Sequence, residues 1–458
     1  MTPTPQARCD LLIIGAGPAG MAAALAAAPS GMRITVVDDN PAPGGQIWRD
    51  GPGVQLPPLA RQHRESLAHH PNIEVLNGTR VVGLGDRANA GNAPALILEN
   101  TTRGWTQHAG QIILCTGARE LLLPFPGWTL PGVTGAGGLQ ALIKGGVDVL
   151  GQRIVIAGTG PLLLAAAATA HKAGAHVVRV AEHTPWRDLA AFAAQLVRWP
   201  SKALQAPTLL HPSLRANTHV LEALGSTQVE QVRLQRGSGT ELLDCDRLAC
   251  GFGLVPNTHL GQMLGCALGD RNGLQVDTLM RTSVPGVYAA GECTGFGGSE
   301  RALVQGAMAG HAAAGNAEAG QTLQNTLARW NAFADALHRH FPVRAQVLAA
   351  LPRANTLVCR CEDVAHSDLQ QRSGWIDAKL HTRCGMGACQ GRICGAAAQV
   401  LYGWAPQPAR HLLSPARLST LASAAPDFIH EPITESTSKA WTLLPPTPQP
   451  WCMSLKRN

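Results

Sequence analysis

The chain has 458 residues, of which 45% are hydrophobic, 15% charged and 4% aromatic, and its formal net charge is +7. A chain of this length divides into two or three domains, and its apolar content is sufficient for buried cores. Lysine and arginine are scattered without a basic run, so we expect no nucleic-acid partner. The apolar stretch 161–170 is too short to span a bilayer, so we expect no transmembrane segment.

The N-terminal residues 1–9 lack the apolar centre of a signal peptide, and a strand pattern starts at Asp10. We therefore expect a cytoplasmic protein, with peripheral attachment at the inner face of a membrane as the alternative. In a reducing compartment, clustered cysteines are more often metal or redox ligands than disulfides. Five of the 12 cysteines fall between Cys359 and Cys394, so we expect ligands there.

The first nucleotide signal is a glycine-rich turn at residues 15–20, with sequence GAGPAG, which follows the apolar run Leu11–Ile14. Gly15 permits a tight turn, Gly17 lets a pyrophosphate approach the backbone, and Gly20 allows close helix–strand packing. A second apolar run ends at Asp38, which is placed to accept ribose hydroxyls. Glycines that only turn a strand into a helix would not need this acid, so we predict a dinucleotide site.

A second strand–turn–helix signal follows the apolar run Ile154–Ala157 and contains Gly158 and Gly160. Leu163 stands where the third glycine is expected, and should push helix and strand apart. Glu182 follows the next apolar run and is placed to accept a ribose hydroxyl of NAD. Binding of NAD(P) and a domain that has kept its fold without its ligand are both open at this site.

The remaining strand signals indicate that the chain returns to its first domain. A buried run ends at Leu114, two strand-to-glycine junctions follow near Gly253 and Gly291, and residues 302–314 are typical of an Ala-rich helix. We predict these divisions: a discontinuous FAD-binding domain at 1–125 and 245–330, an NAD(P)-type domain at 126–244, a helical connection at 331–350, a [2Fe–2S] domain at 351–410 and a tail at 411–458.

The cysteine segment contains a close pair, Cys359 and Cys361, and a later trio, Cys384, Cys389 and Cys394. Four thiolates are enough to hold a [2Fe–2S] cluster, and the intervening glycines let backbone amides turn toward its sulfurs. The alternatives are a zinc knot, which more often uses shorter cysteine spacings, and buried free thiols. We favour the cluster.

The two glycine-rich units, together with residues 115–118 (CTGA) and 286–292 (GVYAAGE), resemble the two-dinucleotide-domain flavoproteins that include thioredoxin and ferredoxin reductases. The resemblance covers residues 9 to about 315. It implies that the first unit binds FAD, that residues 44–49 run beside the isoalloxazine ring, and that Glu292 replaces the usual aspartate near the ribityl chain. No Cys-x-x-Cys pair occurs between 126 and 350, which disfavours disulfide reductase chemistry. The residues expected to contact FAD are Gly15, Gly17, Pro18, Ala19, Gly20, Asp38, Gly45, Gln46, Thr116, Gly117, Gly291 and Glu292.

The cysteine segment is similar to the bacterioferritin-associated-ferredoxin-like [2Fe–2S] domain found in the opine oxidase, hydrogen cyanide synthase and D-hydroxyproline dehydrogenase family, namely in the A, B and alpha subunits of these three complexes respectively. The motifs CRCE and GMGACQGRIC carry the resemblance. It implies that Cys359, Cys361, Cys389 and Cys394 are the ligands, with Cys384 as a spare or substitute. The expected architecture is α/β, with two Rossmann-like dinucleotide-binding domains and a small C-terminal cysteine-rich iron–sulfur domain.

This family resemblance implies an electron-transferring subunit of a heteromeric dehydrogenase. A partner subunit of the D-amino-acid-oxidase type would oxidise an amino or imino acid, and this chain would pass electrons through FAD and the cluster to a quinone or dye-like acceptor. Further expectations are FMN at a subunit interface and a small ferredoxin-like subunit. No catalytic triad or carboxylate pair is indicated, so no catalytic side chain is named. Two alternatives remain: a self-contained NAD(P)H-dependent reductase that feeds the cluster, and a non-catalytic assembly or electron-storage subunit.

Overall fold

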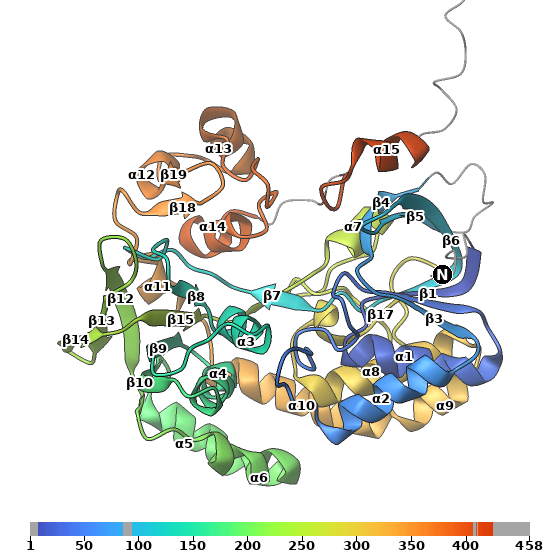
Figure 1. Cartoon of the computed structure of the whole chain (residues 1–458), viewed down its shortest axis with the longest axis horizontal. Helices are drawn as coiled ribbons and strands as arrows, with labels where there is room; N and C mark the ends of the chain where they lie inside the picture. The colour runs from blue at the N-terminus through green and yellow to red at the C-terminus, as the bar shows by residue number, and fades with distance from the viewer. Residues whose placement is uncertain (1–7, 86–93, 406–408, 410, 425–458) are drawn as a thin grey trace, which may run out of the picture.

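The computed structural model describes residues 8–85, 94–405, 409 and 411–424. Three bodies are visible in Figure 1: a first nucleotide unit, a second nucleotide unit and a cysteine-rich body above the second unit. The part of the predicted tail beyond residue 424 lies outside the described residues.

The first body is built on a seven-stranded sheet with the order β3-β2-β1-β6-β5-β4, in which β17 also pairs with β6. The central strands are parallel and almost fully buried, which explains their unbroken apolar sequences. Strands β4, β5 and β6 pair antiparallel and leave β4 at the edge. The strands are β1 (Arg8–Ile14), β2 (Ile34–Val37), β3 (Ile73–Leu76), β4 (Arg80–Leu84), β5 (Ala95–Glu99), β6 (Gly104–Leu114) and β17 (Val287–Ala289).

Two helices from opposite ends of this body pack closely together beneath the sheet: α1 (Pro18–Ala27) and α8 (Ser299–Ala313). Glycine permits the approach, because a Cβ on Gly306 would lie 2.1 Å from the Ala19 carbonyl oxygen and one on Gly310 would lie 2.2 Å from that of Ala23. The other helices of this body are η1 (Ala28–Ser30), α2 (Pro58–His69), α7 (His259–Leu264), η3 (Gly291–Thr294) and α9 (Ala317–Thr322).

The second body has a five-stranded parallel sheet with the order β11-β10-β9-β15-β8 and a three-stranded antiparallel sheet, β12-β13-β14. Strands β7 (Ala118–Glu120) and β16 (Leu254–Pro256) pair where the chain crosses between the two nucleotide units. The strands are β8 (Val133–Gly135), β9 (Arg153–Gly158), β10 (His176–Glu182), β11 (Leu214–Arg215), β12 (Thr218–Leu224), β13 (Gln231–Arg236), β14 (Gly239–Asp244) and β15 (Arg247–Gly251). Its helices are α3 (Ala136–Lys144), α4 (Pro161–Lys172), α5 (Trp186–Gln195), η2 (Leu196–Arg198) and α6 (Pro200–Leu209).

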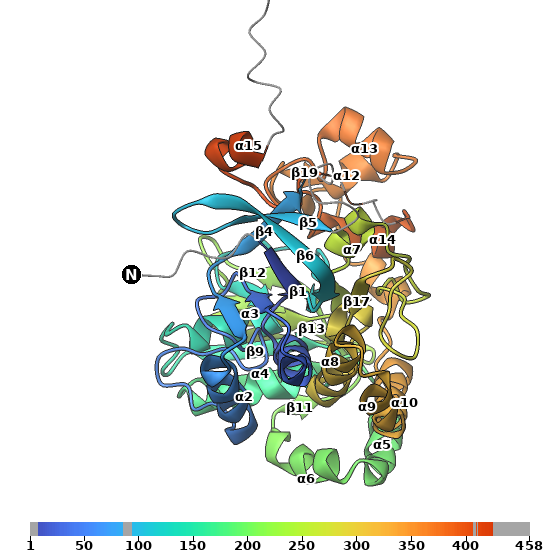
Figure 2. The ribbon, with the colours of Figure 1, turned by 90° about the vertical axis from the view of Figure 1, so that its right-hand side faces the viewer.

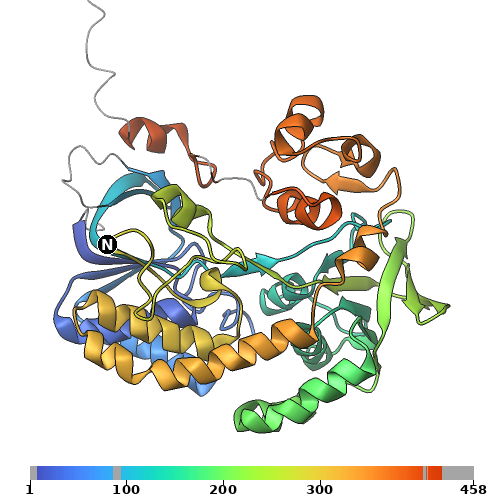
Figure 3. The same cartoon turned by 180° about the vertical axis from the view of Figure 1, so that it is seen from behind.

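Helices α10 (Gln324–His340) and α11 (Ala345–Ala349) carry the chain from the first body across to the second, as seen from behind in Figure 3. The cysteine-rich body follows and shares a hydrophobic core with the second unit, since Ala397 packs with Leu348 and the strands of that unit. Its elements are β18 (Leu357–Cys359), β19 (Val364–Ala365), α12 (His366–Leu369), α13 (Trp375–Thr382) and α14 (Cys394–Tyr402).

The chain then returns to the first body. Residues 411–424, which include α15 (Leu418–Ala424), lie over β4, β5 and β6, as Figure 2 shows. The sequence predicts this stretch only as the start of a tail. In the part of the chain that the structure describes, no helix combines the length and apolar character needed to cross a membrane.

Candidate cofactor sites

A cavity of about 360 Å³ lies at the carboxyl ends of the parallel strands of the first unit. This is where ligands bind in open α/β sheets. Of the residues predicted at the FAD, all except Gly20 line this cavity: Gly15, Gly17, Pro18, Ala19, Asp38, Gly45, Gln46, Thr116, Gly117, Gly291 and Glu292. The structure thus brings together residues that are far apart in the sequence.

The glycine-rich loop has little room for side chains at two of its three glycines. A Cβ on Gly15 would lie 2.2 Å from the carbonyl oxygen of Cys115, and one on Gly20 would lie 1.8 Å from that of Gly15. Gly17 differs, because its Cβ would meet only the Cα of Gly45 at 3.9 Å. Helix α1 starts at the next residue without a side-chain cap, so its first backbone amides are available to a phosphate.

Asp38 both lines the cavity and fastens the glycine loop to strand β2. One carboxylate oxygen accepts a hydrogen bond from the Ala16 amide at 2.6 Å, and the other accepts one from the Asn40 amide at 2.8 Å. The side chain is 6% exposed. Its position at the end of β2 marks the adenosine ribose in this kind of fold.

The far wall of the cavity is formed where the chain crosses between the units. The Thr116 hydroxyl donates to the Asn257 carbonyl oxygen at 2.6 Å, and the Asn257 amide donates to the Gly117 carbonyl oxygen at 3.0 Å. Glu292 also lines the cavity, and burial raises the pKa of its carboxyl although Arg301 opposes the shift. Gln46 is exposed, and its side-chain oxygen accepts from Arg49 at 2.9 Å.

The glycine loop of the second unit is covered by the chain itself. Both carboxylate oxygens of Glu182 are used, by the amides of Gly160 at 2.9 Å and of Thr184 at 2.8 Å, and the residue is 4% exposed. Burial raises the pKa of the Glu182 carboxyl. Phe341, from the segment between α10 and α11, packs over the loop, with its Cβ 3.9 Å from where a Cβ of Gly160 would lie.

Leu163 is accommodated differently from the third glycine of the first unit. It is 1% exposed, and a Cβ on Gly251 of strand β15 would lie 2.9 Å from its Cδ2 atom. The room that Leu163 needs is therefore provided by a glycine on the neighbouring strand. None of the predicted second-site residues Gly158, Gly160 and Glu182 lines the cavity of the first unit or the larger cavity described below.

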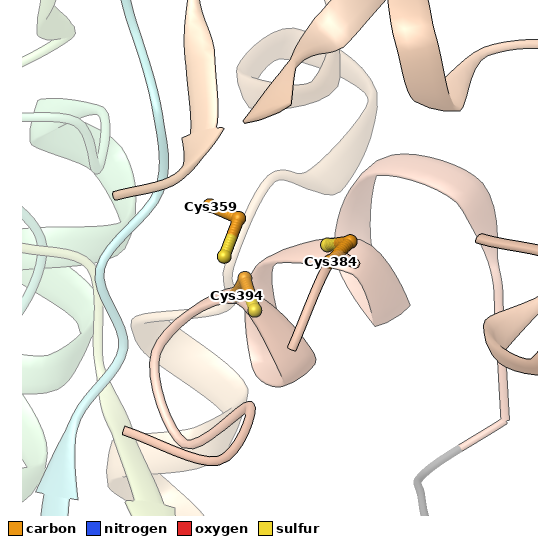
Figure 4. Close-up of side chains that lie close together, drawn as sticks. All are labelled: Cys359, Cys384 and Cys394. Carbon is orange, nitrogen blue, oxygen red and sulfur yellow. The ribbon is translucent and has the colours of Figure 1, made fainter. Parts of the chain in front are cut away.

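The cysteine-rich body gathers cysteines from three places in the sequence. Figure 4 shows Cys359 at the end of β18, Cys384 after α13 and Cys394 at the start of α14, and their sulfurs lie within 4.8 Å of one another. Cys389 is in hydrogen-bonding contact with Cys394 and with Cys361. All four predicted ligands thus lie in one connected group, and Cys384, predicted as the substitute, is part of its buried centre.

Backbone amides point at several of these sulfurs. Cys359 accepts hydrogen bonds from the amides of Gly385 and Glu362, and contacts with the Cys384 and Cys394 thiols lower its pKa most. Gly387 is needed beside the group, because its Cβ would lie 2.4 Å from the Cβ of Cys361. A thiolate is the form that binds metal, so amide donors and depressed pKa values suit a metal or cluster site.

A larger cavity, of about 650 Å³, lies between the crossing strands, the cysteine-rich loop 385–392 and residues 409–415. Arg119, His259 and Arg392 line it, and no acidic side chain does. Burial and the charge of Arg392 lower the pKa of Arg119 to about 10, and burial with the charge of Arg119 lowers that of His259 to about 4. This clustering of cations favours an anionic ligand.

Several residues of both cavities were not anticipated from the sequence. Thr79–Val81, Asn257, Leu413 and Ser414 line the first cavity. They carry no motif, and only the return of the chain to the first body brings the last two there. The sequence offers no local signal that would have indicated them.

The fold and the cavity define the class: an α/β dinucleotide-binding flavoprotein. A family model described as pyridine nucleotide-disulphide oxidoreductase matches residues 9–317, and the chain belongs to this family. It is 31% identical to the A subunit of opine oxidase from Agrobacterium tumefaciens, over 84% of each chain. It is 32% identical to the HcnB subunit of hydrogen cyanide synthase from Pseudomonas protegens, over 84% of this chain and 89% of the relative.

The fold is also that of L-proline dehydrogenase from P. horikoshii. The TM-score is 0.61 at 19% sequence identity, and the match covers 90% of this chain and 79% of that one. The predicted two-unit α/β flavoprotein fold is therefore confirmed. The iron–sulfur assignment and the individual ligands stay predictions.

Proposed function

We propose that this chain is the FAD-binding, electron-transferring subunit of a heteromeric dehydrogenase that oxidises an amino or imino acid, such as an opine or D-hydroxyproline. The observation that carries the proposal is the grouping of five cysteines, in the same chain as a dinucleotide cavity, beside a second cavity that reaches toward the first. Leu413 and Ser414 line both cavities. The relatives are themselves named as subunits, which supports a partner for this chain.

The residues present fit the two proposed cofactors. The amides at the start of α1 would hold the pyrophosphate of FAD, Asp38 its ribose, and the loop Gly45–Gln46 would run beside the ring. Four thiolates from the cysteine group would hold a [2Fe–2S] cluster. When bound, FAD accepts electron pairs and the cluster carries single electrons. The chain's own part is to position the two groups and to supply amide donors to the sulfurs.

The cationic cavity supports one further cofactor. Arg119 and Arg392 line it without an acidic partner among its lining residues, which suits a phosphate group. FMN, expected from the family resemblance at a subunit interface, has such a group. The partner subunits are then a dehydrogenase of the D-amino-acid-oxidase type and a small ferredoxin-like chain.

The self-contained NAD(P)H reductase is less well supported. A pyrophosphate at the second glycine loop would need the place where Phe341 packs beside Gly160. The ribose-binding acid Glu182 is already engaged by two backbone amides. The assembly or storage subunit differs from the proposal only in the absence of turnover, so activity after adding a dehydrogenase subunit separates the two.

The test is anaerobic purification with flavin, iron and sulfide analysis of the wild-type chain and of three cysteine variants. We expect FAD with about two irons and two sulfides per chain. Cys361→Ser and Cys389→Ser should lose the iron and keep FAD, whereas Cys384→Ser, the matched control, should keep both. Zinc or no metal in the wild-type chain would contradict the cluster, and full iron in both of the first two variants would contradict the ligand set.

A further inference from the structure

The chain segment after the cysteine-rich body is bound to the edge of the first sheet. Here we call residues 411–420 the strap. The amides of Leu413 and Ser414 donate to the carbonyl oxygen of Val82, at 2.7 and 3.3 Å. Val82 lies at the irregularity of edge strand β4, between the residues that pair with β5. The strap thus satisfies an edge carbonyl that the sheet leaves unpaired.

A buried acid anchors the other end of the strap. Glu99, on β5, is 3% exposed. It accepts hydrogen bonds from the Arg417 amide at 2.9 Å and from the Thr420 hydroxyl at 2.6 Å. The Arg417 guanidinium also donates to the carbonyl oxygens of Asn100 at 2.7 Å and Thr101 at 3.0 Å. A carboxylate this deeply buried needs such partners.

Glycines make room for the strap. A Cβ on Gly104 would lie 2.2 Å from the Cγ2 atom of Thr420, so any side chain there would displace the strap. Thr420 itself is 1% exposed. Opposite, a Cβ on Gly83 would be in ordinary contact with His411 and Leu412, at 3.6 Å. The seat for the strap is therefore part of the first body's shape.

The strap reaches the dinucleotide cavity at one particular end. Thr79–Val81 line that cavity, and the Thr79 amide donates to the Asp38 backbone carbonyl oxygen at 2.9 Å. They therefore lie at the adenosine end, next to the residue that marks the ribose. Leu413 and Ser414 line the cavity too, and are bonded to Val82, the next residue along. Arg392 of the cysteine-rich loop donates to the Leu413 carbonyl oxygen and so ties the strap to that body.

We propose that the strap is part of the cofactor site: it closes the adenosine end of the first cavity and slows the release of the bound flavin dinucleotide. This inference rests on the proposed binding of FAD. A strap that only covers a sheet edge would stabilise the fold without affecting release. Release of flavin is therefore the property that separates the two roles.

The experiment compares the full-length wild-type chain with Arg417→Ala/Thr420→Val, which removes the anchors at Glu99. Free flavin is followed by fluorescence after dilution, with iron content and thermal unfolding measured on the same samples. We expect release at least about tenfold faster in the variant, with unchanged iron. Arg33→Ala is the control, because it removes an exposed arginine paired with Asp10 on the same body, and it should release flavin at the wild-type rate.

If the double variant does not fold, Thr420→Val alone, which keeps the side-chain shape, should still speed release by a smaller factor. Release at the wild-type rate from a folded variant whose strap is cleaved faster by protease would overturn the strap's role and leave FAD binding intact. A wild-type chain that neither retains nor takes up FAD would overturn the proposed function itself, and the strap's role with it.

Discussion

The two nucleotide units of this chain share one local design and differ in what lies in front of it. In both, an acid at the end of the second strand accepts a hydrogen bond from an amide of the glycine loop: Asp38 from Ala16 at 2.6 Å and Glu182 from Gly160 at 2.9 Å. The first loop opens into a cavity of about 360 Å³, whereas Phe341 packs over the second. The acid and glycine pair thus fastens the turn whether or not a ligand binds.

The difference teaches that a glycine-rich motif reports a turn, and that open space in front of it decides binding. In the second unit the covering residue is also held from behind, because the Phe341 ring packs edge-on to that of Phe192 with centroids 5.0 Å apart. Opening that loop would cost the burial of an aromatic side chain. We therefore expect the two units to respond oppositely to the same ligands.

The largest effect is expected for Gly17→Leu in the first unit. Its backbone has φ −71°, which any residue adopts, and its Cβ meets only Gly45, so the fold should survive. The larger side chain would occupy the place of the pyrophosphate. Flavin content should fall to near zero, a loss of affinity of at least about 3 kcal/mol or a hundredfold. Absorbance of the purified chain at flavin wavelengths measures this.

The matched control is Gly239→Leu, in an exposed hairpin where a Cβ would meet only the Arg236 carbonyl oxygen, at 3.8 Å. It should keep full flavin. Wild-type flavin content in Gly17→Leu would show that the dinucleotide does not bind at this loop.

A smaller effect is expected from a histidine buried beside the second loop. His183 is 5% exposed and stacks on His219, and burial with the nearby His219 lowers its pKa from 6.5 to about 4. The unfolded chain takes up this proton at higher pH than the folded chain, so stability is lost as pH falls below about 6.5. Between pH 7 and 5.5, His183 should account for a loss of about 1 kcal/mol.

His183→Gln removes this titration, so its free energy of unfolding, measured with denaturant, should fall less steeply over that pH range. His69→Gln, at an exposed histidine, is the control and should follow the wild-type slope. An unchanged slope in His183→Gln would show that the side chain is protonated or solvated in the folded protein.

The smallest effect, none, is expected when NADH or NADPH is added anaerobically to the wild-type chain. Because Phe341 and Glu182 occupy the second loop, the visible flavin spectrum should not bleach and the unfolding temperature should not rise. Dithionite, which needs no binding site, should bleach the same sample. Rapid bleaching by NADH would instead make the self-contained reductase the leading function.

By itself, the sequence determined the two βαβ units and most of the first site, because these depend on local rules: apolar runs make strands, and glycines stand where a Cβ would strike a carbonyl oxygen, as at Gly15 and Gly20. The cysteine motif likewise indicated which thiols would meet. The grouping of Cys359, Cys384 and Cys394 brings Cys384 closer to the centre than its predicted place as a substitute.

Only the tertiary structure decided the rest, since it depends on which distant segments fill or leave space. Nothing local to Gly158–Glu182 shows that Phe341 covers the loop, or that Gly251 makes room for Leu163. Nothing local to residues 411–420 shows that they return to Glu99 and Val82 and line the first cavity. Local chemistry specifies a turn, but its access to a ligand is set by long-range packing.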